Sequence, residues 1–250
     1  MADFDNRLVR GTATVADGVD AGLRAHMLRV YNYMVGALAL TGVVAYLVAN
    51  TPALLNAFYH EVMTANGVTL SPTILGWVVM LAPLALVFFL SFRIMQMSQA
   101  AAQATFWAYA AMVGASLASI LIVYTGASVA MTFFVTAATF GVMSLWGYTT
   151  GRDLTGMGNF LFMGLIGILL ASLANMFFKS PAINFVVSIL GVVIFTGLTA
   201  WDTQKIKNTY YMVGGDAAVA GKAAIMGALA LYLDFLNIFL FLLRFMGNRR

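Results

Sequence analysis

The chain has no cysteine among its 250 residues. Disulfides, thiolate metal sites and cysteine nucleophiles are therefore excluded. Only two histidines are present, His26 and His60, so a zinc site is not expected. Charge is scarce as well, since 9% of the residues are charged, whereas soluble domains have about 25%. So little charge indicates a membrane protein.

Apolar residues dominate the composition, with 62% hydrophobic residues and a mean hydropathy of +0.91. A helix needs about 18 apolar residues to cross a bilayer. Seven runs meet this criterion: Leu28–Val48, Ile74–Phe92, Ala102–Tyr124, Val129–Tyr148, Met157–Phe178, Ile183–Trp201 and Ala223–Met246. No polar stretch after Arg29 is long enough to fold as a separate domain. The sequence therefore predicts an all-α membrane protein with one seven-helix transmembrane domain over residues 28–247.

The segments outside these runs are short. Residues 1–27 are polar and mixed in charge and lack the apolar core of a signal peptide, so we expect a short, flexible cytoplasmic tail. In the loop 49–73, the stretch LLNAFYHEVM predicts an amphipathic helix on the membrane surface. Tight turns at 124–128 and 179–181 predict two antiparallel helix hairpins.

Small residues four positions apart lie on one face of a helix and let two helix backbones approach closely. Such pairs occur at Gly114 and Ala118 and at Gly167 and Ala171. Close helix contacts are expected at such pairs; the alternative interpretation is that small residues are frequent in any membrane helix.

The distribution of Lys and Arg predicts the orientation in the membrane. With the N-terminus in the cytoplasm, nine of the thirteen basic residues lie on the cytoplasmic side, as the positive-inside rule requires. The basic pI near 9.4 thus reflects topology, and no nucleic-acid partner is expected. Seven spans would place the C-terminus outside, which Arg244, Arg249 and Arg250 oppose. A last segment that enters and leaves on the same side is the alternative.

Two carboxylates are the most informative polar residues of the apolar runs. Asp202 ends the sixth run, and Asp234 lies near the middle of the seventh. An ionised carboxylate at the bilayer centre costs about 2.5–3.5 kcal/mol on insertion scales. Partners are therefore expected: the other carboxylate, a cation, or a water-filled path.

Asp202 and Asp234 are expected to face each other. Each stands roughly 15 Å from the loop that joins the two helices, at 1.5 Å per residue. Two carboxylates in contact cannot both ionise cheaply, so the pair shares a proton near neutral pH. When both are ionised, they form a hard-oxygen site suited to Ca²⁺. Arg93, at the cytoplasmic end of the second run, could pair with either. Mutual neutralisation without function is the alternative interpretation.

Three motifs carry a family resemblance: LYLDFLNIFLFLLRFMG at 231–247, AWDTQKIK at 200–207 and TGRDLTGMGNFLFMGLIG at 150–167. They resemble the Bax inhibitor-1 family, also called the transmembrane BAX inhibitor motif family, and its bacterial branch in particular. The resemblance covers about residues 20–247. It implies two three-helix layers around a central C-terminal helix.

The resemblance also implies a function. Family members are described as pH-sensitive calcium leak channels, in which the matching positions Asp202 and Asp234 would form the pH sensor. Arg93 would act as the gating latch to Asp202. The bacterial branch also includes proteins that interact with the membrane protease FtsH. The segment MVGGDAAVAGKAA departs from the family as a longer loop between the two aspartates.

Together these observations predict a Ca²⁺ leak channel of a bacterial inner membrane, gated by protonation of Asp202 and Asp234. An interaction protein that modulates a membrane protease such as FtsH is the alternative. No enzyme and no cofactor are expected, because the contexts WD and LDF differ from the YD and GxGD motifs of intramembrane aspartyl proteases.

Overall fold

The computed structural model describes residues 2–64, 67–213 and 216–249. The elements in chain order are α1 (Ala2–Asn50), α2 (Pro52–Phe58), β1 (Tyr59–Thr64), β2 (Gly67–Pro72), α3 (Ile74–Arg93), η1 (Ile94–Gln96), α4 (Gln99–Val123), α5 (Gly126–Thr149), α6 (Thr155–Phe178), α7 (Pro181–Val213) and α8 (Ala217–Met246). Within these described ranges, seven helices are long and apolar enough to cross a membrane. The predicted all-α membrane fold is confirmed.

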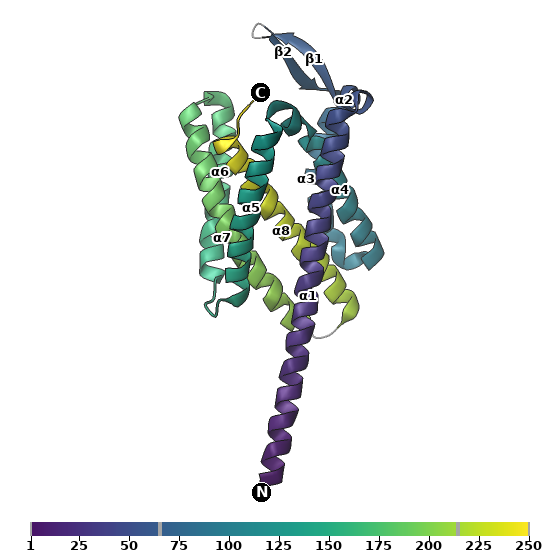
Figure 1. The fold of residues 1–250 in the computed structure, drawn as a ribbon, viewed down its shortest axis with the longest axis vertical. Coiled ribbons are helices and arrows are strands. Elements are labelled where there is room, and N and C mark those ends of the chain that lie inside the picture. The colour runs from purple at the N-terminus through teal and green to yellow at the C-terminus, as the bar shows by residue number, and fades with distance from the viewer. Residues whose placement is uncertain (1, 65–66, 214–215, 250) are drawn as a thin grey trace.

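Helix α8 is the centre of the bundle. Of its most apolar window, 61% of the residues are buried, against 11% for α3. It packs against α7, α1, α5 and α4 and runs obliquely between two groups of helices (Figure 1). Helices α1, α3 and α4 pack together on one side of it, and α5, α6 and α7 on the other. This arrangement agrees with two three-helix layers around a C-terminal helix.

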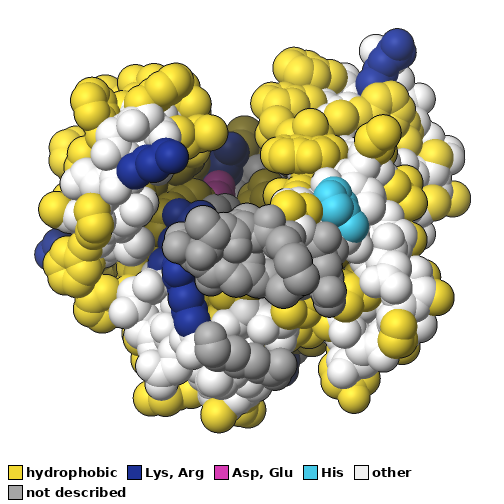
Figure 2. All heavy atoms as spheres, turned by 90° about the horizontal axis from the view of Figure 1, so that it is seen from above, with side chains coloured by type: hydrophobic (Ala, Val, Ile, Leu, Met, Phe, Trp, Pro, Cys, Tyr) yellow, Lys and Arg dark blue, Asp and Glu magenta, His cyan; other side chains and the backbone are white. Residues whose placement is uncertain are grey.

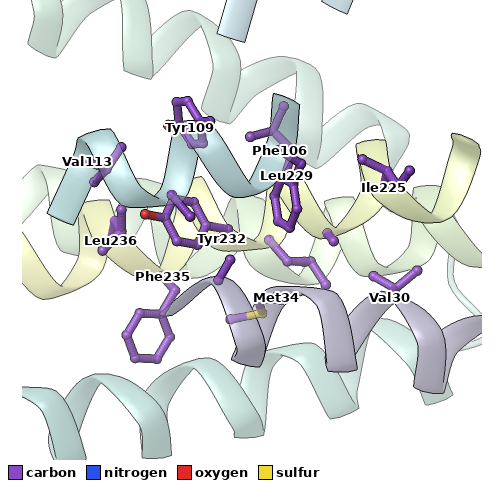
Figure 3. Close-up of a cluster of buried hydrophobic side chains, with 14 of the residues drawn as sticks. Val30, Met34, Phe106, Tyr109, Val113, Ile225, Leu229, Tyr232, Phe235 and Leu236 are labelled. Atoms are coloured by element: carbon purple, nitrogen blue, oxygen red, sulfur yellow. The ribbon is translucent and has the colours of Figure 1, made fainter. Parts of the chain in front are cut away.

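The main core lies where α1, α4 and α8 meet (Figure 3). Tyr232 of α8 is fully buried there and forms a 2.6 Å hydrogen bond with Thr41 of α1. The Thr41 hydroxyl donates in turn to the carbonyl of Ala110 in α4, at 2.9 Å. These bonds join three helices at a depth where no water competes for them.

Polar caps begin several of the spans. The side chains of Thr73 and Ser98 accept hydrogen bonds from backbone N–H groups in the first turns of α3 and α4. Asp216 accepts two such bonds, from Ala218 and Val219, at the start of α8. Ser, Thr and Asp are favoured at these positions because their oxygens satisfy otherwise unpaired N–H groups.

The two ends of the first span differ from the prediction. Residues 2–27 belong to α1, which is continuous and extends beyond the bundle at its N-terminal end (Figure 1). Leu23 and Met27 are buried in the core, so α1 packs against the bundle before residue 28. After α1, only Pro52–Phe58 is helical, and the rest of the predicted amphipathic helix forms strand β1. Its aromatic and β-branched residues favour pairing with β2.

The two predicted hairpins have different outcomes. Helices α6 and α7 pack side by side after their tight turn. Helices α4 and α5 are also joined by a tight turn but share few contacts in the described part of the chain, because they enter opposite layers. The antiparallel packing predicted for them is therefore wrong.

Of the two predicted small-residue contacts, one is present and one is not. Gly114 lies against the backbone of Thr41, where a Cβ would come within 2.6 Å of the Thr41 carbonyl oxygen. That contact is confirmed. A Cβ on Gly167 would meet no atom within 4 Å, so the contact predicted there is wrong.

The connection between α7 and α8 is shorter than the sequence suggests. Helix α7 continues to Val213, and α8 already begins at Ala217. Gly214 and Gly215 lie outside the described residues. The segment expected as a longer loop is therefore mostly helix. Helix α8 is a single helix of 30 residues, which favours a spanning seventh segment over one that enters and leaves on the same side.

Candidate functional site

Asp202 and Asp234 meet at the interface of α7 and α8. Asp202 is half-buried, whereas Asp234 is only 4% exposed. Their carboxyl groups lie within hydrogen-bonding reach of each other. A bond between two carboxyl groups requires a proton on one of them, because an ionised carboxylate can only accept. The structure thus brings together the two residues that the sequence paired.

One oxygen of Asp234 is unsatisfied by the rest of the described chain. Its Oδ2 atom is buried and receives no hydrogen bond from any N–H or O–H group of the described residues. An unsatisfied buried oxygen is costly in a low-dielectric interior. A proton held by the pair, or a cation beside it, is what would relieve that cost.

Lys205 is the cation whose charge acts on Asp202. It follows Asp202 by one turn of α7, but its Nζ atom lies over the Trp201 ring, 4.9 Å from the ring centre. The ammonium group is exposed and gains a cation–π interaction there. Lys205 therefore influences the pair from the solvent side without forming an ion pair with it.

Arg93 lies elsewhere. It is exposed and donates a 2.6 Å hydrogen bond to Gln96 Oε1 within its own segment. Element η1, which follows Arg93, contacts the beginning of α8, where Lys222 donates to the carbonyl of Met95. Among the described residues, no ion pair joins Arg93 to Asp202. The predicted Arg93–Asp202 latch is not formed in this structure, because α3 ends at the start of α8 rather than beside Asp202.

The pair was also predicted to bind a metal. Over the described residues, no group of three or more His, Cys, Asp or Glu side chains is placed to hold an ion. Ca²⁺ takes six to eight oxygen ligands, so Asp202 and Asp234 would need neutral oxygens or water to complete a shell. Two carboxylates alone are suited to a weak cation site rather than to a tight structural site.

A chain of hydroxyl groups reaches the neighbourhood of Asp202 and was missed from the sequence. Tyr31 Oη lies 2.6 Å from Ser144 Oγ, which lies 2.9 Å from Thr203 Oγ1. Tyr31 and Ser144 line a groove of about 530 Å³ between α1 and α5. The three residues come from three separate helices, so no local spacing in the sequence could have connected them.

Gln204 was also missed. Its side chain accepts from the N–H of Leu154 and donates to the carbonyl of Arg152, both at 2.8 Å. Lys207 Nζ donates to the Tyr148 carbonyl at 2.9 Å. These bonds tie α7, just beyond Asp202, to the connection between α5 and α6. The segment that carries Asp202 is thereby held in one layer of the bundle.

These features define a class of protein: a seven-span helical membrane protein whose central helix carries half of a buried carboxyl pair. A family model described as "Inhibitor of apoptosis-promoting Bax1" matches residues 23–250. The chain belongs to this family, the Bax inhibitor-1 family.

Three similar proteins come from bacteria. An uncharacterized protein of Rickettsia prowazekii is 50% identical over 252 residues, which covers 100% of both chains. An uncharacterized protein of Caulobacter vibrioides is 46% identical over 252 residues, again with 100% of both covered. The inner membrane protein YbhL of Escherichia coli is 49% identical over 231 residues, which is 92% of this chain and 94% of the relative.

Proposed function

We propose that this protein is a pH-sensitive ion leak channel for Ca²⁺, gated by protonation of the pair Asp202 and Asp234. The observation that carries the proposal is the close approach of these carboxyl groups inside the bundle, with Asp234 Oδ2 buried and without a hydrogen-bond partner among the described residues. The site lies in the inner membrane of a bacterium, as the name of the E. coli relative states for that protein.

The pair can exist in two states of different charge. With one shared proton, the carboxyl groups are joined and tie α7 to α8. With both ionised, they repel each other and present negative oxygens, which hard cations such as Ca²⁺ prefer. Proton release therefore changes both the contact between the two helices and the affinity of the path for a cation. A change in flux between roughly pH 6 and 8 follows.

The alternative is an interaction protein that modulates a membrane protease such as FtsH. One observation favours it: the N-terminal part of α1 projects beyond the bundle, away from the other helices (Figure 1). A projecting helix offers a surface to a partner on the side that we assign to the cytoplasm. In this case the buried pair would serve only the fold. We expect no enzymatic activity in either case.

Flux measurements separate these functions. The purified protein is reconstituted into liposomes that contain a Ca²⁺-sensitive dye, and influx is recorded from about pH 5.5 to 8.5, a range that brackets the expected titration. The wild type should conduct with a pH-dependent rate. The variants Asp202→Asn and Asp234→Asn should lose that dependence, while Asp153→Asn, a carboxylate outside the pair, should retain it. Absence of flux in well-folded wild-type protein would favour the interaction protein.

A further inference from the structure

A second charged region lies at the opposite end of α7 and α8 from the α7–α8 connection. There, a groove of about 890 Å³ is bounded by the last turns of α6, the first turns of α7, the end of α8 and the residues that follow it. Lys179, Arg244 and Arg249 line it, and no acidic residue does. Figure 2 looks onto this end of the molecule and shows several Lys and Arg side chains there, with an acidic side chain visible deeper in the hollow between two hydrophobic lobes. We call this region the basic groove.

The three cations have no acidic partner among the described residues. The Arg244 guanidinium lies 5.7 Å from the centre of the Phe241 ring, and that of Arg249 lies 5.8 Å from the centre of the Tyr124 ring. Aromatic faces orient a guanidinium but do not neutralise it. The groove therefore keeps a concentrated positive charge.

The backbone that carries Arg249 is held in place. Residue Tyr124 pairs with Arg249 in an antiparallel bridge. The N–H of Thr125 donates to the Asn248 carbonyl at 3.0 Å, and the N–H of Asn248 donates to Ser128 Oγ at 2.9 Å. The residues after α8 are thus fastened to the turn between α4 and α5, and Arg249 belongs to a defined site.

Lys179 is held by an unusual backbone conformation. It ends α6 in the left-handed region, with φ 50° and ψ 33°, where glycine or asparagine is ordinarily found. Helix α7 begins two residues later, at Pro181. Its N-terminal end adds a partial positive charge at the same edge of the groove.

The walls of the groove are apolar and open to the outside. Leu169, Leu173, Met176, Phe185 and Phe245 line it, with more than half of each side chain exposed. In a membrane-spanning segment, such exposed apolar side chains contact acyl chains. Asn175, Asn184, Ser172 and Ser188 supply neutral polar groups between these walls and the cations.

We propose that the basic groove binds the phosphate head group of an anionic phospholipid, with an acyl chain along the apolar wall of α6. A free phosphate ion would use the cations but not the exposed Leu and Phe side chains, whereas a phospholipid uses both. Basic pockets between membrane helices are suited to such head groups, and Arg binds phosphate oxygens in bidentate fashion. With the N-terminus in the cytoplasm, the groove lies in the outer leaflet. The C-terminal arginines that oppose the positive-inside rule then have a ligand.

Native mass spectrometry of the full-length protein in detergent tests this site. Phosphatidylglycerol and phosphatidylcholine are titrated separately, and the affinity of the first bound lipid is measured. Phosphatidylglycerol should bind roughly tenfold more tightly or better, since each nearby cation contributes about a fivefold factor. The triple variant Lys179→Gly, Arg244→Gln, Arg249→Gln should bind both lipids alike. The control Arg152→Gln, in the α5–α6 connection, should bind as the wild type does.

The single variant Lys179→Gly keeps the test valid if the triple variant does not fold. Glycine adopts a positive φ without strain, so this change removes the charge and favours the turn. Its affinity for phosphatidylglycerol should fall about fivefold. Equal binding of the two lipids by the wild type, or unchanged affinity in the charge variants, would overturn the proposal. Displacement of phosphatidylglycerol by submillimolar inorganic phosphate would show a site for the free ion and overturn the lipid assignment.

Discussion

The Asp202–Asp234 pair and the basic groove, which lie on the same two helices α7 and α8, accommodate ionisable groups in opposite ways. Asp234 is 4% exposed inside the bundle, next to Asp202, whereas Arg244 lies exposed at the end of the same helix. Ten residues, or about 15 Å of helix, separate Asp234 from Arg244. At that distance across a packed bundle the two side chains do not neutralise each other. Each charged region must therefore find its partner locally.

The difference shows how the partner depends on depth. A carboxyl group can lose its charge by taking up a proton, so it can be placed in the interior at the cost of sensitivity to pH. An arginine keeps its charge at any accessible pH, so it is placed at the edge, where lipid head groups and water are available. The interior pair is thus suited to switching and the basic groove to constant binding.

Removal of one carboxylate from the pair is the change with the largest expected effect. In Asp234→Asn and Asp202→Asn, the repulsion that holds a shared proton near neutral pH is lost, so the Ca²⁺ flux should no longer vary between roughly pH 6 and 8. The affinity for Ca²⁺ should fall about tenfold, because the site loses an anionic oxygen. Dye-loaded liposomes at stepped pH measure both quantities.

Circular dichroism and size-exclusion profiles of these variants serve as controls for folding. A wild-type pH profile and wild-type flux in both Asn variants would show that the pair is structural. The pair would then have no role in switching, and the interaction protein would be the better supported of the two proposed functions.

Neutralisation of single cations ranks second and tests which cation acts on the pair. Lys205→Gln removes the charge that reaches Asp202, so the midpoint of the pH response should move upward by a few tenths of a unit. Arg93→Gln should leave the midpoint unchanged, because Arg93 is bonded to Gln96 instead. The same liposome assay measures both variants.

The resemblance-based latch makes the opposite prediction, since it expects Arg93→Ala to raise the basal leak. A higher leak from a folded Arg93 variant, with no effect of Lys205→Gln, would therefore make Arg93 rather than Lys205 the cation that acts on the pair. It would indicate a second conformation in which Arg93 reaches Asp202.

Much of this architecture could be predicted from the sequence, because apolar runs long enough to cross a bilayer directly predict the membrane-spanning helices. The proximity of Asp202 and Asp234 could also be predicted. Their helices are adjacent and joined by a short connection, and the two residues lie at similar distances from it. The position of Arg93 did not follow. The sequence places Arg93 at a certain depth in the membrane but does not show which helices lie beside it. That depends on how the two layers pack.

Other parts could not be predicted for related reasons. The bonds of Gln204 to Arg152 and Leu154 join residues about 50 positions apart, and no periodic pattern reports them. The basic groove combines Lys179, Arg244 and Arg249, which only the assembled ends of α6 and α8 bring together. In the sequence, the C-terminal arginines were noticed only because they oppose the positive-inside rule.

A neutral hydrogen bond at similar burial provides a scale for the charged pair and is expected to rank third. Thr41→Val removes the hydroxyl that joins Tyr232 to Ala110 and leaves a buried phenol without its partner. The free energy of unfolding should fall by about 1–3 kcal/mol. Reversible denaturation in detergent measures it, and Tyr232→Phe is the matched partner variant. The pH profile of the flux should remain as in the wild type in both cases, because neither group titrates near neutral pH.

The smallest effect is expected at Asp153, a carboxylate that has what Asp234 lacks. Asp153 is exposed and accepts hydrogen bonds from the hydroxyl and the N–H of Thr155, at 2.6 and 2.9 Å. The hydroxyl bond first, and then the backbone bond, lower the pKa of Asp153 below its ordinary value. A lowered pKa in the folded state stabilises the protein above the unfolded pKa of about 4, and this contribution disappears as the pH falls through the lower folded value. Asp153→Asn should therefore lower the thermal midpoint only slightly at about pH 7, and the difference from the wild type should vanish at a pH low enough to protonate Asp153 in the folded state. Thermal unfolding at the two pH values checks this. A difference that instead appeared between roughly pH 6 and 8 would mean that Asp153 contributes to the titration assigned to the buried pair.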